Sequence, residues 1–276
     1  MKQLRYLLNI VPSNTLGNRG CAVSSAVPVG VALHKDTPLV THNTIPSSND
    51  VCPHCFSTLT GKASSCRCSN SPYLDALQRH CIPSLLQDNL GGHHSRLEGL
   101  TIKALIQLTV QPEDYISKYQ NLCYTVLPDD YLKGVMKGLG EVYSLVTSKH
   151  PRFVEDNMAM VMGRVRLNQI GFENEHGNCG AVFDTLSYVN HSCVPNSEIE
   201  WEESGNCTLH SVKEINEGEE VTFDYLGGGK DLGVAKRRQL LEEMWGFKCN
   251  CEACQIRRKK GKGRVMGKRL QLKKFK

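Results

Sequence analysis

Apolar residues recur at two different spacings along the chain, and each spacing predicts a different kind of element. Between Pro128 and Lys149 they repeat every three or four residues, which is typical of one face of an α-helix. The positions in this stripe are Leu132, Val135, Met136, Leu139, Val142, Tyr143 and Val146. Further on, Ile199 and Trp201 alternate with glutamates, which predicts a strand with one buried and one exposed face. We expect the helical stripe to pack in a core rather than to form a partner surface.

Turn-forming residues divide the rest of the chain into short strands and helical stretches. The further elements that we expect are strands within residues 18–40 around a tight turn at Pro28-Val29-Gly30, helices within 84–167, a hairpin across Ser204-Gly205-Asn206, a strand at 219–225 and a helix ending at Gly246. The chain is therefore expected to combine short sheets with a block of helices.

The composition is that of an ordinary globular protein. The chain has 276 residues, of which 40% are hydrophobic and 22% charged, enough for one core and a small satellite. No apolar run approaches the ~18 residues that a membrane-spanning helix needs. The apolar stretch Tyr6-Leu7-Leu8 stops at Asn9, which is too short for a secretory signal. We therefore expect a protein that stays inside the cell, in the nucleus, the cytoplasm or both, with no membrane partner. We also expect it to be a monomer.

Charge is unevenly distributed along the chain. Residues 257–276 carry 11 Lys or Arg and no acid, which leaves 22 basic against 28 acidic residues elsewhere, a net charge of −6. Such a basic tail can contact nucleic acid or act as a nuclear address. It can equally be a solvated, disordered tail without a specific partner. The acidic body suits a basic peptide as its partner.

Thirteen cysteines, an odd number in a chain without a secretory signal, favour metal ligation over disulfides. Three of them form the pattern Cys249-x-Cys251-x2-Cys254, and Cys193 is the obvious fourth ligand. Four thiolates make a closed tetrahedral zinc site, which is structural because no coordination position stays open. The cysteines outside the clusters are expected to be small core residues: Cys21, Cys81, Cys123, Cys179 and Cys207.

The segment from Asn190 to Asn196, Asn-His-Ser-Cys-Val-Pro-Asn, is rich in polar chemistry. An asparagine amide offers an acceptor and two donors, and a histidine ring offers two nitrogens. Both suit recognition of a ligand's amine, carboxylate and purine edges. The alternative is a plain Asx-type turn closed by Pro195, with His191 satisfied in the core. Folding the C-terminal cysteines back to Cys193 would enclose this segment.

This segment, the C-terminal cysteines and the order of elements together resemble the SET-domain protein lysine methyltransferases. The resemblance implies a mainly β fold with a helical insertion (α+β): a β-clip of short sheets, a small cysteine-rich insertion, a helical SET-I region and a zinc-bound post-SET segment. It also implies S-adenosylmethionine-dependent methylation of lysine in a histone or another protein. A catalytically inactive SET and zinc adaptor is the alternative. A nucleic-acid-binding zinc protein is a third reading, but we find no finger helix with base-reading side chains.

The resemblance assigns roles to particular residues. Tyr225 is expected to be catalytic, because a hydroxyl that is neutral near pH 7 can orient the substrate amine for in-line methyl transfer. The residues expected to bind the methyl donor are Arg19, Gly20, Asn168, Ser187, Asn190, His191, Tyr225 and Phe247, with Phe247 against the adenine. Gly20 is expected to allow close approach of the backbone and a positive φ. Asp224 is expected to be a turn carboxylate rather than a general base, and Gly227-Gly228-Gly229-Lys230 a loop rather than a phosphate site.

An earlier cysteine cluster resembles the MYND zinc finger that interrupts the SET domain in the SMYD family. Its expected ligands are Cys52, Cys55, Cys66 and Cys68, with His80 or Cys81 as substitutes. Tyr73 is followed by Leu74 where the family has cysteine, so we expect one zinc at most, and the alternative is a plain loop without metal. The resulting domains are 1–48 (first part of SET), 49–83 (MYND-like), 84–167 (helical insertion), 168–228 (core SET), 229–256 (post-SET) and 257–276 (basic tail).

Overall fold

The protein is described here by a computed structural model, and the residues that it describes are 8–13, 18–43, 95–110, 113–127, 158–174 and 177–255. Several predicted features lie outside them, namely the helix between Pro128 and Lys149, the cluster from Cys52 to Cys68 with His80 and Cys81, and the tail 257–276. Within the described stretches, no helix is long and apolar enough to cross a membrane.

The first sheet brings the beginning of the chain next to a strand from its last third. Its strands are, in order, β1 (Leu8–Pro12), β2 (Arg19–Val23), β10 (Glu220–Phe223) and β7 (Asn190–His191). β7 and β10 run parallel, so that Asn190 lies opposite Thr222 and His191 opposite Phe223. Parallel neighbours leave a sheet at the same edge. The chain after His191 therefore lies beside the chain after Phe223.

The other two sheets have three strands each. The strand order of the second sheet is β3 (Ala32–Asp36), β9 (Cys207–Ser211), β8 (Ser197–Trp201). The strand order of the third sheet is β4 (Val40–Asn43), β6 (Gly177–Val182), β5 (Gln169–Asn174). β8 and β9 form the predicted hairpin, with Ile199 opposite Leu209. The alternation predicted for β8 is confirmed, because its two glutamates are exposed while Ile199 and Trp201 are partly buried.

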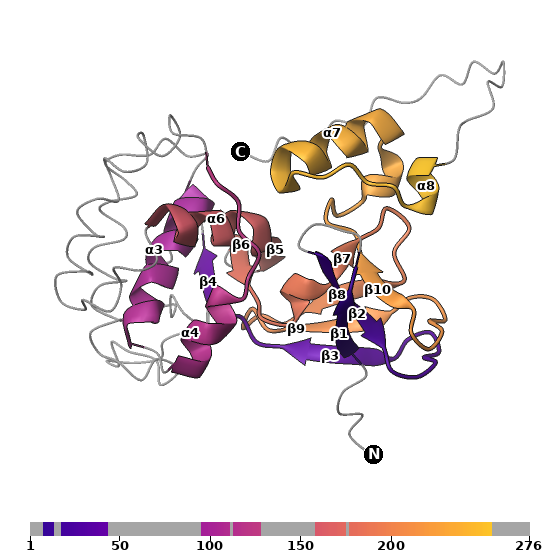
Figure 1. The fold of residues 1–276 in the computed structure, drawn as a ribbon, viewed down its shortest axis with the longest axis horizontal. Helices are drawn as coiled ribbons and strands as arrows, with labels where there is room; N and C mark the ends of the chain where they lie inside the picture. The colour runs from indigo at the N-terminus through magenta and orange to yellow at the C-terminus, as the bar shows by residue number, and fades with distance from the viewer. Residues whose placement is uncertain are drawn as a thin grey trace.

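Three helices are described within the predicted helical region, α3 (Ser95–Val110), α4 (Glu113–Gln120) and α6 (Met158–Asn168). α3 packs against α6, β4 and β6, so the helices lie beside the sheet of β4, β6 and β5 (Figure 1). The buried face of α3 repeats every three or four positions and includes Leu97, Leu100, Thr101, Ala104, Leu105 and Leu108. α4 begins with Glu113 and Asp114, which complement the positive end of the helix dipole.

The main core is drawn from all three sheets. Its fully buried members include Cys21, Val23, Cys179, Ala181, Phe183, Val189, Leu209, Ile215 and Val221. The carboxylate of Asp36 is also buried. It accepts hydrogen bonds from the backbone N–H of Leu186 at 2.9 Å and of Thr37 at 3.0 Å. These bonds fix the short helix η3 (Leu186–Tyr188), which leads directly into β7.

The C-terminal segment, residues 229–255, contains η4 (Gly229–Asp231), α7 (Val234–Trp245) and α8 (Glu252–Gln255), the yellow elements of Figure 1. α7 ends at Gly246 as predicted, and the φ of 77° there is a left-handed cap that glycine adopts readily. Leu241 is fully buried and packs with Cys193, Cys249 and Cys254 in a second, small core. This small core joins the C-terminal segment to the end of β7.

Candidate functional site

Tyr225 and His191 meet because β7 and β10 are neighbours. The backbone N–H of Tyr225 donates to His191 Nδ1 at 3.1 Å, and the hydroxyl of Tyr225 donates to the carbonyl oxygen of Val189 at 2.8 Å. The tyrosine ring packs against Phe223 and Trp245, with centroid distances of 4.8 and 5.2 Å. Burial raises the pKa of Tyr225, so its hydroxyl stays neutral at physiological pH.

A pocket opens beside Tyr225. Its wall comes from α6, η3, β7, the C-terminal segment and the stretches that follow α4 and β10. The wall residues are Cys123, Leu167, Asn168, Ser187, Asn190, His191, Tyr225, Trp245 and Phe247. The structure therefore brings together the residues that the sequence predicts for donor binding, except Arg19 and Gly20. Sequence reasoning missed Cys123, Leu167 and Trp245. Trp245 carries a usable signal, an aromatic residue two positions before Phe247, whereas the other two carry none.

The two asparagines of the pocket wall have fixed orientations. Asn168 Nδ2 donates to two main-chain carbonyl oxygens, both at 2.7 Å. Asn190 Nδ2 donates to the carbonyl oxygen of Arg19 at 2.8 Å and to Glu220 Oε1 at 2.6 Å. Since these partners are acceptors, the amide nitrogens are identified and both are engaged. Each asparagine therefore has its carbonyl oxygen left for a ligand, which suits an ammonium group.

Arg19 lies behind the pocket wall. Its guanidinium stacks over the ring of Tyr188 at 4.6 Å and donates to the carbonyl oxygen of Asn121 at 2.7 Å. Its own carbonyl oxygen accepts the hydrogen bond from Asn190. The side chain of Arg19 thus links the segment after α4 to the first sheet, while its backbone carbonyl orients Asn190 in the pocket wall.

Gly20 lies within β2, and its structural role differs in part from the prediction. A positive φ is wrong for this residue, because the left-handed conformation belongs to Asn18, with φ 55°. Close approach is confirmed. A Cβ on Gly20 would collide with Glu220 Oε1 and lie 2.9 Å from Asn190 Nδ2. The absence of a side chain at Gly20 therefore leaves room for the hydrogen bond between Asn190 and Glu220.

Both ring nitrogens of His191 take part in hydrogen bonds. A backbone N–H only donates, so Nδ1, which accepts from Tyr225, carries no proton. Nε2 therefore carries the hydrogen of the neutral ring, and it lies 3.2 Å from Cys193 Sγ. Burial lowers the pKa of His191 to about 4, which keeps the ring neutral. The side chain of His191 is 0% exposed, so its ring nitrogens are engaged inside the protein, where the sequence suggested recognition of a ligand by them.

Asp224 organises the glycine-rich turn after β10. Its carboxylate accepts hydrogen bonds from the backbone N–H groups of Leu226, Gly228 and Gly229 at 3.0, 2.9 and 2.7 Å. Gly228 has φ 118°, a conformation that favours glycine. This geometry agrees with the predicted turn carboxylate.

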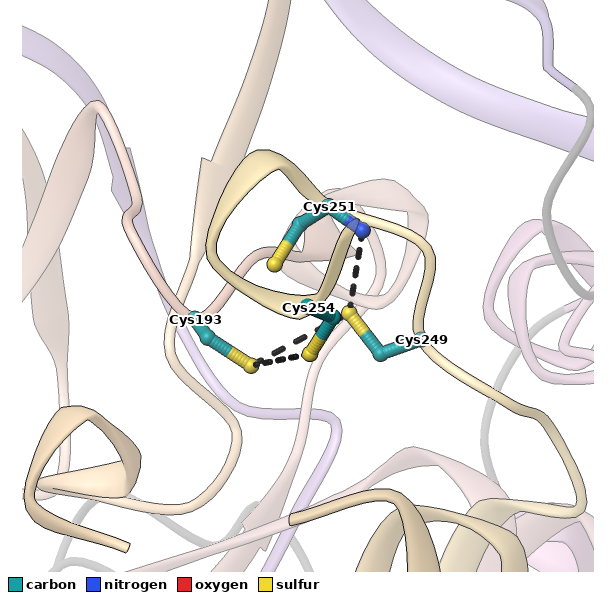
Figure 2. A group of neighbouring side chains, drawn as sticks. All are labelled: Cys193, Cys249, Cys251 and Cys254. Carbon is teal, nitrogen blue, oxygen red and sulfur yellow. Dashed lines mark hydrogen bonds between the residues drawn. The ribbon is translucent and has the colours of Figure 1, made fainter. Parts of the chain in front are cut away.

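The four cysteines predicted to form the C-terminal zinc site gather in one cluster, shown in Figure 2. The Sγ atoms of Cys193, Cys249, Cys251 and Cys254 all lie within 4.8 Å of one another. Cys193 Sγ is 3.9 Å from Cys249 Sγ and 3.7 Å from Cys254 Sγ. A tetrahedron with Zn–S bonds of about 2.3 Å has edges of about 3.8 Å, so the cluster fits zinc. We refer to these residues as the four-cysteine cluster.

Two arginines of α7 that the sequence did not single out bind the four-cysteine cluster. Arg237 is 5% exposed, and its Nη2 donates to Cys254 Sγ at 3.6 Å and to the carbonyl oxygen of Ala253 at 3.1 Å. Arg238 Nε donates to the carbonyl oxygen of Cys249 at 3.0 Å. A guanidinium beside a thiolate metal site offsets part of its negative charge and orients its ligands.

The remaining described cysteines divide into core and pocket positions. Cys21, Cys179 and Cys207 are buried in the main core, as predicted, and burial raises the pKa of their thiols to about 12, 11 and 12. Cys123 is different, because it is half-buried on the pocket wall, where Arg19 donates to its Sγ at 3.5 Å. The prediction of a core position is therefore wrong for Cys123.

The SET domain family matches residues 37–226, which is more than half of the chain. The chain belongs to the SET-domain family. The matched residues extend from the end of β3 through Tyr225, and so include β7, β10 and most of the pocket wall. The SET fold predicted from the sequence is thereby confirmed.

Individual proteins are similar to this SET-domain chain over different lengths. The histone-lysine N-methyltransferase ATXR4 of Arabidopsis thaliana is 23% identical over 278 residues, 86% of this chain and 83% of that protein. A SET and MYND domain-containing protein of Dictyostelium discoideum is 31% identical over 139 residues, 46% of this chain and 38% of that protein. Among solved structures, the SET domain of LSMT bound to lysine and AdoHcy aligns with a TM-score of 0.45 and 12% identity, over 90% of this chain and 53% of that chain.

Proposed function

We propose that this SET-domain protein is an S-adenosylmethionine-dependent protein-lysine N-methyltransferase. The observation that carries the proposal is the convergence of Tyr225, the Asn190-His191 step and Phe247 on one pocket, next to the four-cysteine cluster. The Arabidopsis relative is named a histone-lysine N-methyltransferase, and the proposal extends that class of activity to this chain.

The pocket residues fit the parts of the methyl donor. When bound, S-adenosylmethionine supplies a methyl group on a positively charged sulfur. The free carbonyl oxygens of Asn168 and Asn190 would accept hydrogen bonds from its ammonium group. Phe247 and Trp245 offer aromatic faces for its adenine. Ser187 completes the wall beside β7, with its hydroxyl donating to the carbonyl oxygen of Asp184 at 2.6 Å.

Tyr225 positions the substrate amine. Its hydroxyl donates a hydrogen bond to the carbonyl oxygen of Val189, so the lone pairs of the hydroxyl oxygen can accept a hydrogen bond from a lysine Nζ–H. The lysine would first lose a proton to solvent, and its lone pair would then form the N–C bond, while the electron pair of the C–S bond would stay on the sulfur, which would leave as a neutral thioether. Because the pKa of Tyr225 is raised, the tyrosine orients the amine and does not remove its proton. Alignment of the reacting atoms is the main contribution of this residue.

A structural zinc in the four-cysteine cluster completes the proposal. It would hold the C-terminal segment, and with it Trp245 and Phe247, against the pocket. We further propose a degenerate MYND site with at most one zinc at Cys52, Cys55, Cys66 and Cys68. The Dictyostelium relative carries MYND in its name. The SMYD-like division into the six segments given above belongs to the same proposal.

The substrate is proposed to be a basic peptide, such as a histone tail or another lysine-rich protein segment. The support is the net charge of −6 on residues 1–256, which attracts positive peptides. The location in nucleus or cytoplasm, the monomeric state and any contact of the tail 257–276 with nucleic acid remain predictions.

The test is transfer of labelled methyl groups from S-adenosylmethionine to histones and to lysate proteins. Tyr225→Phe is the matched variant, because it removes the hydroxyl and keeps the ring that packs against Trp245. We expect transfer to fall by about 100-fold or more, since the amine loses its alignment. Donor affinity, measured by calorimetry, should stay close to that of the wild type. Absence of transfer from a wild-type protein that binds the donor would favour the inactive adaptor instead.

A further inference from the structure

A second hollow adjoins the donor pocket and shares Leu167 and Trp245 with it. It lies between the segment that follows α4 and the end of α7, and α6 contributes the rest of its wall. The residues that line it are 124–127, 166–167 and 242–246, and its volume is about 440 Å³. Ligand-binding clefts commonly have volumes of about 300–1,000 Å³, so this hollow, which we call the α6–α7 groove, is large enough for a segment of peptide.

Exposed apolar side chains gather in the α6–α7 groove. In the described part of the chain six large apolar side chains are exposed, and three of them line this groove. These are Tyr124, Val126 and Met244, with exposed fractions of 54%, 84% and 50%. Single exposed apolar side chains are ordinary, whereas several in one hollow with a polar rim mark a binding surface. The groove therefore favours an occupant that has apolar side chains.

The α6–α7 groove also attracts positive charge. Glu242 and Glu243 belong to the last turn of α7, where the negative end of the helix dipole favours cations. Glu242 forms an ion pair with Lys248 at 3.2 Å. Among the described residues, the partner of the Glu243 carboxylate is the neutral amide of Gln239, at 2.8 Å. Arg166 donates instead to the carbonyl oxygen of Glu243 at 3.2 Å, so this carboxylate stays open to a further cation.

The chain carries a segment of matching chemistry in its own tail. Residues 257–276 contain 11 Lys or Arg and no acid. Within them, residues 264–272 combine apolar and basic side chains in the order Arg-Val-Met-Gly-Lys-Arg-Leu-Gln-Leu. The apolar side chains of this segment suit the exposed surfaces of Val126 and Met244, and its cations suit Glu243. A basic segment without apolar residues would match only the charge of the groove.

The tail begins close enough to reach the α6–α7 groove. α8 lies against the middle of α7, where Arg238 Nη2 donates to the carbonyl oxygen of Cys254 at 3.4 Å. Along α7, Arg238 and Met244 are about 9 Å apart. Residues 256–264 can extend over about 30 Å. Residues 264–272 can therefore reach the groove of the same molecule without any change in α8.

We propose that the α6–α7 groove binds the chain's own tail through residues 264–272. A short flexible link gives the attached segment a local concentration of the order of 1 mM. A segment with a Kd of about 0.1 mM would then fill the groove in about nine of ten molecules. The same segment on a separate molecule would be unbound at micromolar concentration. Weak contacts in an open groove are thus sufficient for the tail because it is attached.

The experiment couples lysines to carboxylates with a zero-length carbodiimide in the full chain, and mass spectrometry locates the products. The pair of Lys248 and Glu242 is the internal standard. Each yield is corrected for the coupling of the same glutamate to free ethanolamine. We expect the tail lysines to couple to Glu243 at least about tenfold more than to Glu217, an exposed glutamate outside the groove, because docking raises their local concentration.

Two sets of variants test whether the groove itself holds the tail. Val126→Ser together with Met244→Ser removes exposed apolar side chains from the groove and should lower coupling at Glu243 to the level of Glu217. Val29→Ser is the matched control, because Val29 is 60% exposed and lies outside the groove, and it should leave the coupling unchanged. Persistence of the coupling in the groove variant would show that charge alone attracts the tail and would overturn the proposal.

Two further outcomes would also overturn the proposal. Equal coupling of the tail lysines to Glu243 and Glu217 would identify a tail without a specific site. A yield at Glu243 that rises with protein concentration would assign the bound tail to a second copy of the chain. A selective yield that is independent of concentration supports docking within one molecule.

A consequence for methyl transfer rests on the proposed function. A tail that fills the groove in about nine of ten molecules would weaken the apparent affinity for a competing basic peptide about tenfold. The tail variant Val265→Ser, Met266→Ser, Leu270→Ser keeps every charge, and its KM for a histone peptide should be about tenfold lower, with unchanged kcat. An unchanged KM, with the coupling at Glu243 lost, would overturn the competition alone. Absence of transfer from both proteins, with the coupling intact in the wild type, would overturn the proposed function and leave the docking supported.

Discussion

Cysteine is used in two opposite ways by the main core and by the C-terminal segment. In the core, Cys21 and Cys207 are 0% and 1% exposed among apolar side chains, and burial keeps their thiols protonated. In the C-terminal segment, three cysteines within six residues join Cys193 in one cluster. A single buried cysteine packs as a small apolar residue, whereas four that converge create a ligand set.

The main core and the C-terminal segment are also stabilised by different interactions. The core buries large side chains from three sheets, including Phe183, Leu209 and Ile215. The C-terminal segment has Leu241 as a fully buried apolar anchor, and α8 spans only Glu252–Gln255. A helix of one turn does not persist without tertiary support. The C-terminal segment is therefore expected to depend on metal, and the core is not.

The largest effect is expected from Cys251→Ser, which removes one ligand of the four-cysteine cluster. Zinc affinity should fall by at least about 100-fold, because loss of a ligand exceeds the loss of a bond to a ligand. Donor affinity should fall with it, since Trp245 and Phe247 come from the same segment. Zinc is measured by chelator competition and donor binding by calorimetry. Tight donor binding by a zinc-free variant would contradict this dependence.

A smaller effect, on the stability of the main core and not on zinc binding, is expected from Cys21→Ser. The hydroxyl would be buried at a 0% exposed position in β2, which should lower the free energy of unfolding by about 1–3 kcal/mol. Denaturant unfolding measures this change, and Cys21→Ala, which adds no polar group, is the control. Zinc content should stay at the wild-type value in both variants. A loss of zinc from either one would show that the two regions are not independent.

The smallest effect is expected from Gly20→Ala, which acts on the pocket from the core side. The new methyl group would meet Glu220 and Asn190 and weaken the hydrogen bond between them. Donor affinity should fall by about three- to tenfold, which corresponds to the net contribution of one hydrogen bond. Gly233→Ala is the matched control, because nothing lies within 4 Å of a Cβ there. Equal donor affinities for the two variants would argue against a supporting role of Gly20.

Features that depend on local pattern were predictable from the sequence. The β8–β9 hairpin follows from alternation around Ser204-Gly205-Asn206, and the end of α7 follows from Gly246. The four-cysteine cluster was predictable because zinc requires a fourth ligand and few candidates exist. In each case a short stretch of sequence or a coordination rule limits the answer.

Features that depend on distant partners were not predictable. The guanidinium of Arg19 binds the carbonyl oxygen of Asn121, a partner 102 residues away, so its direction is set by packing and not by its neighbours in sequence. The bond from Arg237 to Cys254 appears only once α7 lies on the cysteine loop. The hydrogen position on His191 likewise depends on the backbone N–H of Tyr225, 34 residues further along the chain. Buried hydrogen bonds of this kind need the folded chain.

The parallel pairing of β7 with β10 has a consequence for tolerance to insertion. The residues between β7 and β10, which include the β8–β9 hairpin, take no part in the pairing of these two strands. The tip of that hairpin, at the exposed Glu203, can thus vary in length while His191 and Tyr225 stay in contact. A fluorescent or affinity tag grafted at this tip should leave methyl transfer intact.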